Sequence, residues 1–166
     1  NNSLEQKFRV INNDTKMMPF SFGGHPAFNV NSIDEYEIQF ECEEDVKANT
    51  LEGPYIHETL IDVIQGKKIP LDKNTFIQDA LIFQDLKSNW VKLVHKSSPH
   101  EVKLNITDFP HLGIWSKPGA HFVCIEPWQG MADYVFHNKD ILQKKGIIVL
   151  ETNKEFSKSF IMEFNT

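Results

Sequence analysis

The stretch Tyr36-Glu37-Ile38-Gln39-Phe40-Glu41-Cys42 alternates apolar with polar side chains at every position. Successive side chains of a β-strand point to opposite faces of the sheet, so this pattern predicts a half-buried antiparallel strand. An α-helix would instead repeat its apolar residues every three or four positions. The fold class therefore depends on how often this two-residue period recurs along the chain.

The strand pattern recurs in several later segments. Residues 90–94 and 102–106 flank a polar, proline-containing stretch and predict a hairpin with a loop longer than two residues. The apolar run 122–125 is typical of a buried strand, and the alternating stretch 157–164 is the predicted last strand. Helical signal is confined to one or two turns over 140–145. The sequence therefore predicts an all-β, antiparallel β-sandwich.

Length and composition limit the possible classes of protein. The chain has 166 residues, of which 40% are hydrophobic, and this predicts a single domain over 1–166. It carries 17 Lys and Arg against 23 Asp and Glu, a formal charge of −6. Nucleic acids and anionic membranes need clustered positive charge, so neither is an expected partner. Arg9 is the one arginine, which disfavours a phosphate-gripping surface.

Targeting and redox signals indicate a reducing compartment. No apolar run approaches the ~20 residues needed to span a bilayer, and the N-terminal residues have neither a basic start nor an apolar stretch. Cys42 and Cys124 form no C-x-x-C pattern and are predicted to be buried thiols. We therefore expect a cytoplasmic protein.

The segment Ser21-Phe22-Gly23-Gly24-His25-Pro26-Ala27-Phe28-Asn29 is the first chemically unusual one. A glycine pair permits backbone turns that are closed to other residues, and Pro26 biases His25 towards an extended conformation. This predicts an imidazole held on a stiff kink between aromatic residues. The alternative interpretation is a turn histidine whose ring caps a backbone carbonyl.

The second unusual segment is His121-Phe122-Val123-Cys124-Ile125-Glu126-Pro127-Trp128. Glu126 ends an apolar strand directly before a proline, so its carboxylate has little freedom to move. Burial raises the pKa of a carboxyl group, which suits a general base at neutral pH. Trp128 could stack on the apolar face of a sugar ring. Alternatively, loop amides satisfy Glu126 and the indole of Trp128 is core packing.

Together these two motifs resemble the aldose 1-epimerase (galactose mutarotase) family, most closely its LacX-like branch. The resemblance rests on Gly23-Gly24-His25-Pro26-Ala27-Phe28-Asn29, on Ile125-Glu126-Pro127-Trp128, on their separation of about a hundred residues and on the late alternating strand. It covers essentially the whole chain, but only the C-terminal half or so of a full-length family member. The implied fold is part of a galactose-mutarotase-like β-supersandwich, with 1–166 as its C-terminal portion.

The resemblance also implies roles for single residues. His25 is the implied general acid and Glu126 the implied general base, whereas Asp79, Trp128 and Asn29 are implied to bind the sugar. For Asp79 the alternative is a turn aspartate before the strand at 80–83. Family members hold the sugar with an arginine and often a further histidine from the N-terminal half, and those positions are not matched here. The activity of this chain alone is therefore open.

The expected reaction interconverts the α and β anomers of a hexose by acid–base ring opening and closure, without a cofactor. The seven histidines lack H-x-H or H-E-x-x-H spacing, so no metal site is predicted. His111 and His121 flank Trp115 and are expected on exposed loops, with an approach to the cleft as the alternative. A non-catalytic carbohydrate-binding sandwich, with Trp115 and Trp128 as stacking platforms, is the alternative. A glycoside hydrolase with two facing carboxylates is a third possibility. The expected partner is a small sugar, and unpaired strand edges leave a homodimer open.

Overall fold

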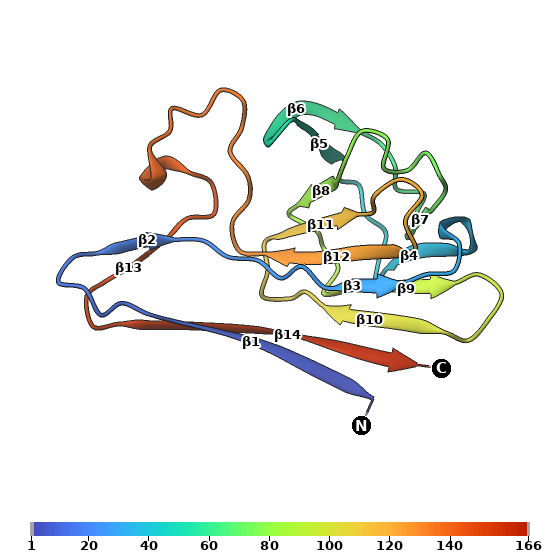
Figure 1. The fold of residues 1–166 in the computed structure, drawn as a ribbon, viewed down its shortest axis with the longest axis horizontal. Coiled ribbons are helices and arrows are strands. Elements are labelled where there is room, and N and C mark those ends of the chain that lie inside the picture. Colours follow the sequence, from blue (N-terminus) through green and yellow to red (C-terminus); the bar gives the residue numbers. More distant parts are fainter. Residues whose placement is uncertain (1, 166) are drawn as a thin grey trace.

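In the computed structural model, which describes residues 2–165, two large antiparallel sheets carry most of the chain (Figure 1). The first sheet has the strand order β1 (Ser3–Ile11), β14 (Glu155–Asn165), β10 (Glu101–Asn105), β9 (Trp90–His95), β4 (Tyr36–Phe40) and β7 (Lys68–Pro70). The second has the order β3 (Ala27–Asn29), β12 (Phe122–Trp128), β11 (His111–Trp115), β8 (Leu81–Gln84), β5 (Ala48–Glu52) and β6 (Tyr55–Ile61). A small ribbon pairs β13 (Ile148–Leu150) with β2 (Met18–Phe20).

Apolar side chains from both sheets point into the space between the sheets and form the core of the sandwich. Phe40 of β4 and Phe83 of β8 meet across the gap, with ring centroids 6.0 Å apart in an edge-to-face arrangement. Both side chains are buried, as expected where alternate residues of facing strands interdigitate. The remaining members of this core come from most strands of both sheets and include Ile38, Val91, Leu93, Leu104, Leu112, Ile114, Val123, Ile125, Phe160 and Met162.

The predicted all-β antiparallel sandwich is confirmed, and so are the strands expected from the alternating segments and from the apolar run 122–125. They correspond to β4, β9, β10, β12 and β14. The segment 140–145 forms only one 3₁₀ turn, η2 (Ile141–Gln143), in which Asp140 caps the backbone N–H of Leu142. A second 3₁₀ turn, η1 (Ile33–Glu35), precedes β4. No helix within 2–165 has the length and apolar character required to cross a membrane.

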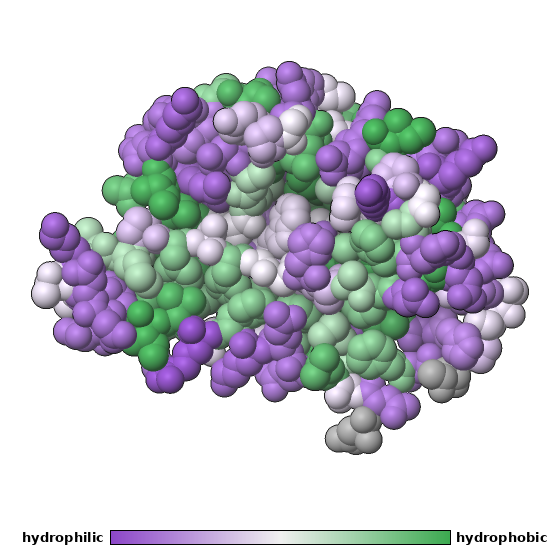
Figure 2. All heavy atoms as spheres, viewed as in Figure 1, coloured by the Kyte–Doolittle hydropathy of each residue, from purple (hydrophilic) through white to green (hydrophobic). Residues whose placement is uncertain are grey.

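The outer face of the second sheet carries a second, smaller apolar cluster. Ile56, Ala80 and Ile82 project from this face and are covered by Met131, which belongs to the long connection between β12 and β13. Figure 1 shows this connection leaving the end of β12 and looping out beside the sheet. In the same view, Figure 2 shows polar residues around the periphery and paler or apolar residues over the middle. The connection thus covers one part of the outer face and leaves a hollow beside it.

Removing the ring of Phe83, which packs against Phe40 of the opposite sheet, tests the core. We expect Phe83→Ala to lower the free energy of unfolding by about 3–5 kcal/mol, because a fully buried aromatic side chain leaves a cavity. The matched control is Phe136→Ala, which makes the same change at a side chain that is 65% exposed and should cost at most about 1 kcal/mol. Urea unfolding measures both. Equal losses in the two variants would contradict this description of the core.

Candidate functional site

The backbone around His25 is hydrogen-bonded to β12 on both sides of the imidazole. Gly24 donates its N–H to the carbonyl of Pro127 at 2.9 Å, and Ile125 donates its N–H to the carbonyl of Pro26 at 3.2 Å. These bonds extend the second sheet by a short segment ahead of β3. They hold the imidazole beside the outward-pointing side chains of β12.

The glycine pair serves close packing and not an unusual backbone conformation. A Cβ atom on Gly24 would lie 2.5 Å from the ring of Phe160, and one on Gly23 would lie 2.4 Å from Cδ1 of Trp128. Neither glycine has a positive φ, so the backbone freedom expected of the glycine pair is not used for a left-handed conformation. Only the absence of a side chain lets this segment approach the core and the indole so closely.

Glu126 and His25 face one another at the end of β12. Oε1 of Glu126 lies 3.4 Å from Nε2 of His25, and Oε2 accepts a hydrogen bond from Nε1 of Trp128 at 3.2 Å. The carboxylate side chain is 5% exposed, whereas the imidazole is 63% exposed. Among the described residues the hydrogen-bond donor to Glu126 is thus an indole, not the loop amides of the alternative interpretation.

Burial sets the electrostatics of this pair. Desolvation raises the pKa of the Glu126 carboxyl group above its usual range, because the charged form loses contact with water. The nearby His25 and the hydrogen bond from Trp128 oppose this shift without cancelling it. Burial, with a smaller contribution from Glu126, also raises the pKa of the Cys124 thiol to about 11. A carboxylate with a raised pKa is a stronger proton acceptor than an exposed glutamate.

Aromatic rings form the walls around the pair. The indole of Trp128 lies over Gly113 of β11, where a Cβ atom would be 2.7 Å from Cζ2. The ring of Trp115 lies edge-on to the imidazole of His25, with centroids 6.5 Å apart and an interplanar angle of 83°. The hollow itself has a volume of about 360 Å³, and its lining comprises Ser21, Phe22, Gly23, Gly24, His25, Glu126, Trp128, Gly130, Met131 and Ala132.

The structure does not bring Asp79 or Asn29 to this hollow. Asp79 lies in a turn with φ 69°, and its carboxylate accepts the N–H of Ala80 at 2.8 Å, which is the geometry of the turn-aspartate alternative. Asn29 pairs with Phe122, four residues along β12 from Glu126, or about 13 Å. Both are exposed, and their sugar-binding roles stay predictions.

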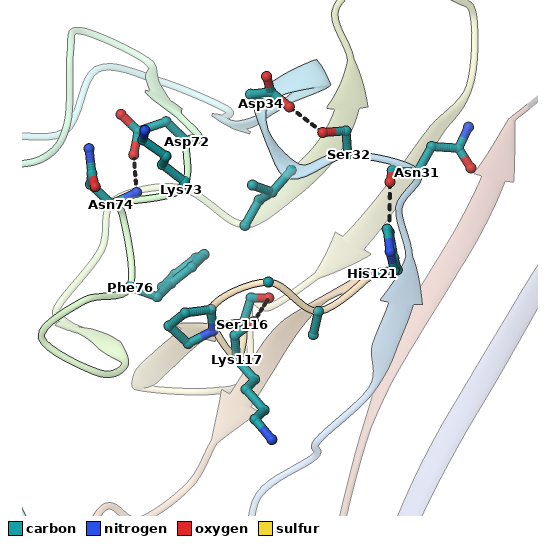
Figure 3. Close-up of a pocket in the computed structure, with 14 residues that line it drawn as sticks. Asn31, Ser32, Asp34, Asp72, Lys73, Asn74, Phe76, Ser116, Lys117 and His121 are labelled. Atoms are coloured by element: carbon teal, nitrogen blue, oxygen red, sulfur yellow. Dashed lines mark hydrogen bonds between the residues drawn. The ribbon is translucent and has the colours of Figure 1, made fainter.

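A second hollow of about 540 Å³ lies elsewhere, between the loops drawn in Figure 3. Its carboxylates are hydrogen-bonded to residues close in sequence: Asp34 accepts a hydrogen bond from Ser32, and Asp72 accepts one from the N–H of Asn74 at 2.7 Å. The ring of His121 points away to the carbonyl of Asn31, at 2.7 Å. This hollow therefore lacks the facing acid and base found beside β12.

Comparison with known proteins agrees with the geometry. The sequence profile of the family described as aldose 1-epimerase matches residues 1–159. The chain belongs to the aldose 1-epimerase family.

Individual relatives match over most or all of the chain. Protein LacX of Lactococcus lactis subsp. lactis, in its plasmid and chromosomal forms, is 28% identical over 171 residues, covering 92% of this chain and 56% of LacX. The crystal structure of a galactose mutarotase related enzyme from Lactobacillus acidophilus is 30% identical, with a TM-score of 0.90, and covers all of this chain and 58% of that one. A galactose mutarotase-like protein from Lactobacillus casei is 27% identical, with a TM-score of 0.86, over 96% and 58%. The chain thus spans little more than half of these relatives.

Sequence reasoning did not place Cys124 beside His25 and Glu126. Cys124 lies two residues before Glu126 on the same face of β12, and its Sγ lies within 4.8 Å of ligand atoms of His25 and Glu126. The i, i+2 spacing on a strand was the available signal. Cys124 is buried as predicted, but Cys42 is only half-buried. The expectation of an exposed loop is wrong for His111, which is buried on β11.

The raised pKa of Glu126 predicts a pH-dependent gain in stability for Glu126→Gln. The fold favours the protonated carboxyl group, so this contribution to wild-type stability is complete below the usual glutamate pKa of about 4.3 and is lost as pH rises through the raised pKa. We therefore expect the variant to have the higher Tm at pH 7, with the difference fading towards pH 4. In a chain of this length, each kcal/mol gained in the free energy of unfolding raises Tm by about 2–4 °C. Calorimetry across this range measures it. The exposed Glu58→Gln is the control, and a lower Tm at pH 7 for the Glu126 variant would contradict the sign.

Proposed function

We propose that the protein carrying this chain interconverts the α and β anomers of a hexose. The observation that supports this proposal is the 3.4 Å separation between Nε2 of His25 and Oε1 of Glu126 in an open hollow. Mutarotation moves protons at two oxygens, the C1 hydroxyl and the ring oxygen, and both are bonded to the same carbon. An acid and a base that serve these oxygens must lie side by side, as this pair does.

The reaction needs proton transfers only. Glu126 takes the proton of the C1 hydroxyl, and protonated His25 gives a proton to the ring oxygen while the bond between C1 and that oxygen breaks. The open-chain aldehyde rotates about C1–C2, and the ring closes on the opposite face. In closure the roles reverse, because His25 then accepts a proton and Glu126 returns one. No covalent intermediate, metal or redox cofactor is required.

The surroundings fit an uncharged sugar. Among the described residues that line the hollow there is no lysine or arginine, so this part of the site disfavours a sugar phosphate. Trp128, which lines the hollow, offers an apolar ring surface, and the raised pKa of Glu126 strengthens the base. Family membership and the similarity to the galactose mutarotase related enzyme support the same substrate class.

Removal of either proton-transfer group tests the proposal. We expect Glu126→Gln and His25→Asn each to slow anomer exchange by about 10²- to 10⁴-fold while sugar binding persists, since shape and most hydrogen bonds remain. Polarimetry of freshly dissolved α-galactose and α-glucose measures exchange, and calorimetric titration measures binding. Because the chain spans 58% of its structural relatives, the assay uses the protein at its full natural length. Near-normal exchange in the Glu126 variant would eliminate this residue as the base, and binding without exchange in the wild type would favour a carbohydrate-binding module.

The hydrogen bond from Trp128 provides a second test through pH. Its indole N–H lowers the pKa of Glu126, so Trp128→Phe should raise that pKa further. The base acts in its ionised form, and exchange falls as pH falls through this pKa. We therefore expect the acid limb of the kcat/KM profile to move to higher pH in the variant. A limb that stays in place or moves to lower pH would contradict the role of Glu126.

A further inference from the structure

Three side chains of the types that bind zinc lie close together, and two of them, His25 and Glu126, line the hollow. A ring nitrogen of His25, Sγ of Cys124 and a carboxylate oxygen of Glu126 all lie within 4.8 Å of one another. We propose that this cluster is a binding site for Zn²⁺ or a similar thiophilic divalent cation, and that the bound metal blocks anomer exchange. The blocking effect rests on the proposed function, whereas metal binding does not.

The distances suit tetrahedral coordination. Nitrogen and oxygen ligands about 2.0–2.1 Å from a tetrahedral zinc lie roughly 3.3–3.4 Å from each other. Nε2 of His25 and Oε1 of Glu126 are 3.4 Å apart. A zinc-bound sulfur would lie about 3.5 Å from these atoms, so Cys124 needs to approach by only roughly 1 Å.

The buried arrangement distinguishes this cluster from a chance grouping of surface acids. The side chains of Cys124 and Glu126 are almost wholly buried, and both project from the same face of one strand. The second carboxylate oxygen is fixed by the N–H of Trp128, as outer partners commonly fix metal-binding carboxylates. His25 is the third ligand and lies on the solvent-exposed side of the cluster. The fourth coordination position of the metal is therefore open to water.

The donor set also selects among metals. One thiolate, one imidazole and one carboxylate favour Zn²⁺, Co²⁺ or Cd²⁺ over Mg²⁺ and Ca²⁺, which prefer oxygen ligands. On binding, the S–H bond of Cys124 breaks, its proton passes to solvent, and sulfur bonds to the metal. The lone pairs of His25 and Glu126 are then committed to the metal. Neither residue can transfer a proton to or from a sugar in that state.

Cobalt provides a binding readout that does not depend on activity. We expect Co²⁺, titrated into the reduced protein, to produce a thiolate-to-metal charge-transfer band in the near ultraviolet that saturates at one equivalent and is displaced by Zn²⁺. Cys124→Ser should abolish the band, and His25→Ala should weaken cobalt binding by at least about tenfold. The matched control is Cys42→Ser, which alters the other free cysteine and should leave the band intact. Because His25 is exposed, its variant tests the site even if the Cys124 variant fails to fold.

The outcomes separate this proposal from the proposed function. We expect micromolar Zn²⁺ to stop anomer exchange and EDTA to restore it. Exchange without any cobalt band, or a band lost in Cys42→Ser but kept in Cys124→Ser, would overturn the metal site while the proposed function stands. A band in a protein that exchanges no anomers would support the site and contradict the proposed function.

Discussion

The buried carboxylate of Glu126 is the constraint on which the rest of the site depends. Strand alternation on β12 sends Ile125 into the sandwich core and Glu126 to the opposite face. A charge on that face, almost out of reach of water, needs partners, and the structure supplies the indole of Trp128 and the imidazole of His25. The same desolvation that makes this carboxylate costly makes it a good proton acceptor.

Two glycines, Gly24 and Gly113, allow the close packing on which the positions of His25 and Trp128 depend. Gly24 lets its segment lie against Phe160 of β14, and Gly113 leaves the space in which the Trp128 indole lies. The first contact ties the backbone beside His25 to the core of the opposite sheet, since Phe160 also packs against Phe8 and Phe109. The position of the imidazole is therefore set by the packing of the whole sandwich and not by a local turn alone.

The sequence predicted what local periodicity encodes, and little of what depends on distant contacts. Strands with one buried face were found because their apolar residues alternate, and the pairing of His25 with Glu126 was expected from two motifs and a family resemblance. Asp79 shows the limit: its short motif fits a family role and a turn equally well, and the turn geometry is what the structure shows. Burial of His111 and the approach of Cys124 to His25 arise from strand pairing across long sequence separations, which a local pattern does not contain.

The hydrogen bond between Trp128 and Glu126 has an optical consequence. An indole whose N–H is donated to a titrating carboxylate changes its emission when that group gains a proton, loses one or binds a metal. The other two tryptophans are differently placed: the Nζ atoms of Lys92 and Lys103 lie 5.4 and 5.6 Å from the ring centroid of Trp90, and Trp115 packs against Phe122. Trp128 is thus a built-in fluorophore beside Glu126, and its emission records the charge state of the carboxylate without any added dye.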